Sequence, residues 1–121
     1  MVDYTETYKQ LLQRAANAFE QLIQLYASDV QDNKQWAIAT VAEARTKRNG
    51  YLERLAHPIM SAAYTGTFVS SIMRFLDEHW PDPTRWAQTN PAKAAQIEHI
   101  HAELKAIMTA IAPIHNALRT S

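Results

Sequence analysis

Glu98 and His101 stand three residues apart, so a helix would place their carboxylate and imidazole on the same face. Carboxylate-bridged metal centres in helical bundles use two such Glu-x-x-His pairs together with two further glutamates. The sequence contains one pair, and Glu20 or Glu43 would have to supply the missing carboxylates. The alternative interpretation is a polar pair beside an apolar stripe, and the missing second pair favours it. A metal site with Glu98 and His101 as ligands is therefore the weaker hypothesis.

His101 and His115 are fourteen residues apart on the same predicted helix, with Met108 midway. At 1.5 Å per residue their separation is about 21 Å, too far for two ligands of one metal ion. Either histidine could ligate a haem iron together with a methionine from another helix, as in some bundles. The chain has no cysteine and hence no covalent haem-attachment motif. Methionine at helical spacing is more typical of a core, so no cofactor is expected.

Arg74 and His79 are separated by four residues near the end of a predicted helix. This Arg-x4-His spacing resembles that of the HEPN ribonucleases, small helical bundles in which an arginine and a histidine from two protomers form an RNA-cleaving site. The resemblance covers six residues, and Phe75 departs from the polar residue usual after the arginine. It implies Arg74 and His79 as catalytic residues. The alternative is an exposed helix end, where the helix dipole favours a histidine.

The segment 80–86 contains two tryptophans and two prolines between predicted helices. Tryptophan and arginine are enriched among the residues that dominate binding energy at protein interfaces. Trp80, Arg85 and Trp86 are therefore the candidate residues for contact with a protein partner. The same rings could instead close one end of the hydrophobic core, as buried aromatic side chains commonly do. The sequence favours this second interpretation.

Composition excludes several classes of function. The 121 residues include no cysteine, which excludes disulfides, thiolate zinc sites and cysteine nucleophiles. Lys and Arg number 12, as do Asp and Glu, whereas strong nucleic-acid binders carry a basic excess. No segment is predicted to cross a membrane, and the N-terminal residues lack the pattern of a signal peptide. We therefore expect a cytoplasmic protein without membrane contact, and we do not expect nucleic-acid binding.

Helical periodicity runs through most of the chain and predicts one all-α domain, residues 1–121, folded as an antiparallel four-helix bundle. The predicted helices cover residues 4–30, 33–56, 60–79 and 91–118. Two of them carry apolar stripes at heptad spacing: Tyr8, Leu12, Ala15, Phe19, Leu22 and Tyr26 in the first, and Ile97, Ile100, Leu104, Ile107, Ile111, Ile114 and Leu118 in the last. The second helix could end at either of two places, Asn49-Gly50 or His57-Pro58. Pro58 is favoured because it gives helices of similar length.

The predicted third helix is apolar on nearly every side, so we expect it to be the most buried. Small residues recur along one side of it, at Ala62, Gly66 and Ser70, where another backbone could approach closely. The helix could be buried by its own chain or by a second copy. The net charge of zero favours self-association, and no catalytic motif of a common class is present. We therefore expect a non-catalytic bundle protein that acts through protein–protein contact as a homodimer.

Overall fold

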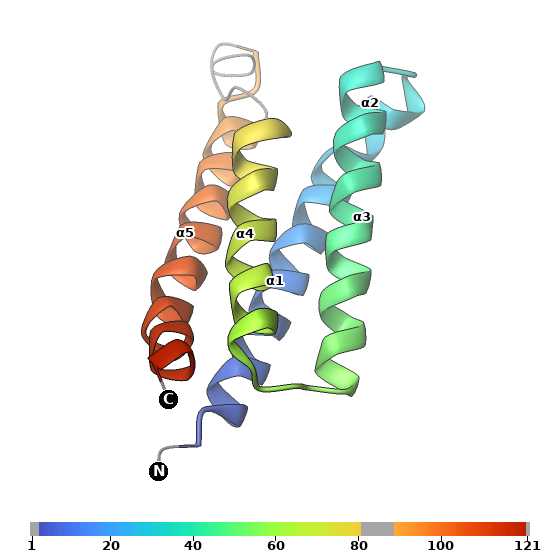
Figure 1. The fold of residues 1–121 in the computed structure, drawn as a ribbon. Coiled ribbons are helices and arrows are strands. Elements are labelled where there is room, and N and C mark those ends of the chain that lie inside the picture. The colour runs from blue at the N-terminus through green and yellow to red at the C-terminus, as the bar shows by residue number, and fades with distance from the viewer. Residues whose placement is uncertain (1–2, 81–88, 121) are drawn as a thin grey trace.

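The computed structural model describes residues 3–80 and 89–120, and every regular element in these ranges is an α-helix. The helices are α1 (Thr5–Leu25), α2 (Ala27–Gln31), α3 (Gln35–Ala56), α4 (Ala62–Glu78) and α5 (Pro91–Thr120). The predicted all-α class is confirmed. The long helices α1 and α4 run in one direction and α3 and α5 in the other (Figure 1). In the described ranges, no helix combines the length and hydropathy needed to cross a bilayer.

The first predicted helix, residues 4–30, is divided at Tyr26, so the described chain has five helices where the sequence predicts four. Tyr26 has φ −100° and ψ 8°, which ends α1 and precedes the short helix α2. Its side chain is fully buried and its ring lies 5.4 Å from that of Trp36. The apolar spacing continues through this point, and spacing alone therefore gives no sign of the break.

A turn at Asn33 separates α2 from α3. Asn33 has φ 59°, a left-handed conformation that asparagine adopts more readily than most residues. Helix α3 consequently begins at Gln35, two residues later than predicted. It continues through Gly50 and ends at Ala56, with His57 as C-cap. The choice of the break at Pro58 is confirmed, because a residue before proline is disfavoured in the helical conformation.

Helix α4 buries one face only, so the prediction that it is the most buried helix is wrong. Ser61 caps its N-terminus, and Ser61 Oγ accepts a hydrogen bond from the Tyr64 N–H at 3.2 Å. Four residues of the helix are buried, namely Thr65, Phe68, Ile72 and Phe75. Met73 is 49% exposed although it is apolar. An apolar composition on all sides did not produce burial on all sides, because neighbouring helices cover only one side of α4.

The buried face of α4 packs against α1 and α3 through aromatic rings. The ring of Phe75 meets that of Phe19 edge-on at 4.8 Å. The ring of Phe68 stacks on that of Tyr51 at 5.1 Å. This packing fixes the rotation of α4 about its own axis, and the opposite face is therefore turned away from the core.

Helix α5 confirms the predicted stripe. Asn90 is its N-cap, with Asn90 Oδ1 accepting from the Lys93 N–H at 3.1 Å, and Pro91 is its first residue. The helix continues through Pro113 to Thr120. All members of the predicted stripe except the last are buried: Ile97, Ile100, Leu104, Ile107, Ile111 and Ile114.

Candidate interaction surface

The face of α4 that points away from the core is composed of small and apolar residues. We call it the α4 outer face: Ala62, Ala63, Gly66, Thr67, Ser70 and Met73. At 100° per residue, Ser70 lies at its centre, opposite the buried residues Phe68 and Phe75. Because the side chains are short, the surface is hollowed there, with a volume of about 630 Å³.

Three basic residues from three helices border this hollow. They are Lys47 of α3, Arg74 of α4 and His115 of α5. Lys47 Nζ is paired with Glu43 of its own helix at 3.3 Å, and Arg74 Nε lies 3.9 Å from Glu78. The described residues that line the hollow include no carboxylate. The hollow therefore offers hydrogen-bond donors and hydroxyl groups over a floor of small residues.

His115 is held in place by α4. Its Nδ1 lies 2.8 Å from Oγ1 of Thr65, which is fully buried. Its ring lies over Gly66, where a Cβ atom would come within 3.0 Å of Cε1 of His115. A residue without a side chain is therefore needed at position 66 for the imidazole to lie there undisturbed.

The hydroxyl of Thr65 has three possible hydrogen-bond partners. Its Oγ1 lies 3.0 Å from the carbonyl oxygen of Ser61 and 3.3 Å from that of Ala62, and 2.8 Å from Nδ1 of His115. Thr65 donates to His115 or accepts from it according to the tautomer of the ring. In either case the hydrogen bond fixes the position of the imidazole against α4.

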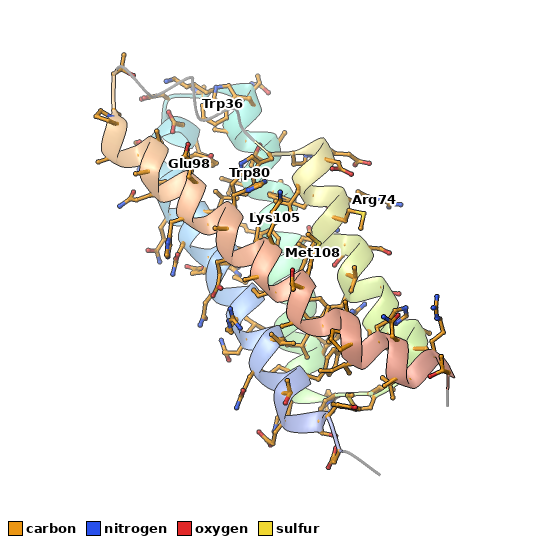
Figure 2. The ribbon with its side chains drawn as sticks, turned by 90° about the vertical axis from the view of Figure 1, so that its left-hand side faces the viewer. Trp36, Arg74, Trp80, Glu98, Lys105 and Met108 are labelled. Carbon is orange, nitrogen blue, oxygen red and sulfur yellow. The ribbon has the colours of Figure 1, made fainter. Side chains whose placement is uncertain are left out.

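Arg74 and His79, the predicted ribonuclease pair, both lie near Glu78. Glu78 Oε1 is 3.9 Å from Arg74 Nε, and Glu78 Oε2 is 4.0 Å from His79 Nε2. Arg74 is exposed, and Figure 2 shows it projecting outward from α4. The ring of His79 packs on that of Phe75 at 5.7 Å. Arg74 borders the hollow described above, and His79 does not.

Glu98 and His101, the predicted metal ligands, lie in different surroundings. Glu98 is exposed (Figure 2). The ring of His101 packs against that of Trp80 at 5.0 Å. Burial lowers the pKa of His101, and the nearby charge of Lys105 lowers it further. Within the described residues, no group of three acidic, histidine or cysteine side chains is placed to hold a metal ion.

Trp80, the first of the predicted interaction residues, is partly buried. Its ring lies 6.3 Å from that of Phe75 and beside His101, so it covers the end of the core between α4 and α5. Arg85 and Trp86 lie outside the described residues, and the role predicted for them stays a prediction.

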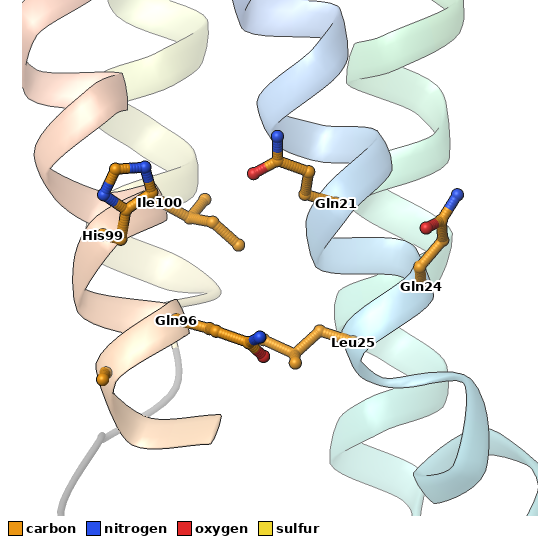
Figure 3. Close-up of a pocket in the computed structure, with 7 residues that line it drawn as sticks. Gln21, Gln24, Leu25, Gln96, His99 and Ile100 are labelled. Carbon is orange, nitrogen blue, oxygen red and sulfur yellow. The ribbon is translucent and has the colours of Figure 1, made fainter. Parts of the chain in front are cut away.

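A second groove of about 600 Å³ lies between α1 and α5. Figure 3 shows Gln96 and His99 of α5 facing Gln21 and Leu25 of α1 across it. Its polar groups are amides and one imidazole, and no charged side chain appears among the described residues that line it. The groove therefore offers neutral hydrogen-bonding groups and, in contrast to the hollow over α4, no permanent cation.

Sequence reasoning missed a buried ion pair between Asp29 of α2 and Lys93 of α5. Each lies on an extension of a predicted stripe. Asp29 follows Tyr26 by three residues, and Lys93 precedes Ile97 by four. Extending both heptad patterns by one position would have placed two opposite charges on buried faces, which is the signal that could have identified the pair.

The chain matches no protein-family model, no curated protein and no solved structure. Inference about its function therefore depends on the geometry of its own residues.

Proposed function

We propose that this protein is an antiparallel four-helix bundle, with α2 as a short extension of α1, and that it acts without catalysis by self-association through the α4 outer face. The observation that carries the proposal is the exposure of that face. Met73 is 49% exposed, and Ile59, just before the helix, is 50% exposed. Between them lie the small residues that form the hollow. Exposed apolar side chains beside a concave surface are typical of a protein contact.

Two further properties support self-association. The net charge of the chain is zero, so two copies do not repel each other through their overall charge. Short side chains at Ala63, Thr67 and Ser70 of the α4 outer face allow a second helix to approach them closely, which increases the number of van der Waals contacts. The cytoplasmic location expected from the sequence is part of this proposal.

The mass of the protein in solution tests the proposal. Light scattering on a size-exclusion column should give twice the mass of the chain at micromolar concentration. Ala63→Arg places a long charged side chain on the α4 outer face, and we expect it to weaken the dimer by about a hundredfold. Ala106→Arg is the matched control, because Ala106 is an exposed alanine of α5. A wild-type monomer at every concentration would overturn the proposal.

The ribonuclease alternative has one observation in its favour, the approach of Arg74 and His79 to the same carboxylate of Glu78. If the alternative is correct, the protein cleaves single-stranded RNA, and both Arg74→Ala and His79→Ala abolish cleavage while the helical circular dichroism stays unchanged. Absence of cleavage by the wild-type protein would exclude it.

The metal- or haem-binding alternative likewise stays a prediction. It requires Glu98, His101 or His115 to ligate an ion or a haem. Visible absorbance and elemental analysis of the purified protein test it, and a colourless, metal-free protein would contradict it.

A further inference from the structure

We draw no further inference here: the strongest candidate, the hollow over α4 that Lys47, Arg74 and His115 border, lies on an exposed face of small and apolar residues, and nothing in the structure shows what covers it.

Discussion

Lys93 Nζ, in the first turn of α5, contacts the carboxylate of Asp29 in α2, and the two residues are 64 positions apart in the sequence. Both are buried, with Asp29 5% and Lys93 9% exposed. Lys34 provides a second cation, with its Nζ 3.3 Å from Asp29. The contact joins α2 to α5 at one end of the molecule, and the two lysines together compensate the carboxylate for its removal from water.

Replacement of Asp29 by Asn should lower the free energy of unfolding at neutral pH by about 3 kcal/mol, because the buried charge of Lys93 loses the charge of Asp29. Urea unfolding of both proteins measures the difference. Asp32→Asn is the control, since Asp32 is exposed and has no ion pair among the described residues. A loss no larger than that of the control would contradict a stabilising role for the pair.

The contribution of Asp29 should also depend on pH. Burial acts to raise the pKa of Asp29, but hydrogen bonds from Lys93 and Lys34 outweigh it and hold the pKa below its ordinary value. A carboxyl group with a lowered folded-state pKa stabilises the protein above its unfolded pKa, about 3.9, and loses this effect as the pH falls through the folded value. The difference between wild type and Asp29→Asn should therefore shrink below about pH 4. A difference that stays constant to pH 2 would refute this.

Tyr51 of α3 should titrate far above an ordinary tyrosine. Burial raises its pKa to about 12, although the hydrogen bond to Ser71 acts in the opposite direction. Since the folded-state pKa lies above the unfolded value of about 10, the stabilisation is present below pH 10 and disappears as the pH approaches 12. Absorbance at 295 nm should show one phenol fewer ionising near pH 12 in Tyr51→Phe than in the wild type.

The hydroxyl of Tyr51 also makes a measurable contribution to stability. It lies 2.6 Å from Ser71 Oγ, which itself donates to the carbonyl oxygen of Phe68 at 2.8 Å. Tyr51→Phe keeps the ring stacked on Phe68 and leaves Ser71 with a partner. We expect a loss of about 1 kcal/mol, measured by urea unfolding at pH 7. A loss above 3 kcal/mol would mean that the ring packing had also changed.

The effect of Gly66→Ala should depend on His115. Alanine is favoured over glycine inside a helix by about 1 kcal/mol, but its Cβ would lie 3.0 Å from Cε1 of His115. The imidazole must therefore shift and lengthen its hydrogen bond to Thr65. We expect little net change in the wild type and a gain of about 1 kcal/mol in a His115→Ala background. Equal effects in both backgrounds would show that the ring does not lie over Gly66.

The ion pair between α1 and α5 should contribute little. Arg14 Nη2 lies 2.6 Å from Glu103 Oε1, and Arg14 Nε lies 3.3 Å from Oε2. Both side chains are partly exposed to water, which weakens the attraction. Glu103→Gln should cost under about 1 kcal/mol, and 0.5 M NaCl should reduce the difference. A cost similar to that of Asp29→Asn would contradict the role assigned to burial.

The sequence alone determined the helical class and the direction in which two helices face the core. Each stripe position from Tyr8 to Tyr26 and from Ile97 to Ile114 is buried as predicted. Local chemistry also determined the end of α3 before Pro58 and the start of α5 at Pro91. These features depend on residues within one or two helical turns of each other, and they can therefore be predicted from the sequence alone.

Tertiary packing decided the features that concern function. Composition could not show which side of α4 remains exposed, because the rings of Phe19 and Tyr51, from other helices, fix its rotation. The break at Tyr26 likewise occurs without a change in apolar spacing. Thr65 and His115 are 50 residues apart, and the hydrogen bond between them exists only when α4 and α5 pack together. The periodicity of one helix specifies its own faces, but the contact between two helices depends on the side chains of both.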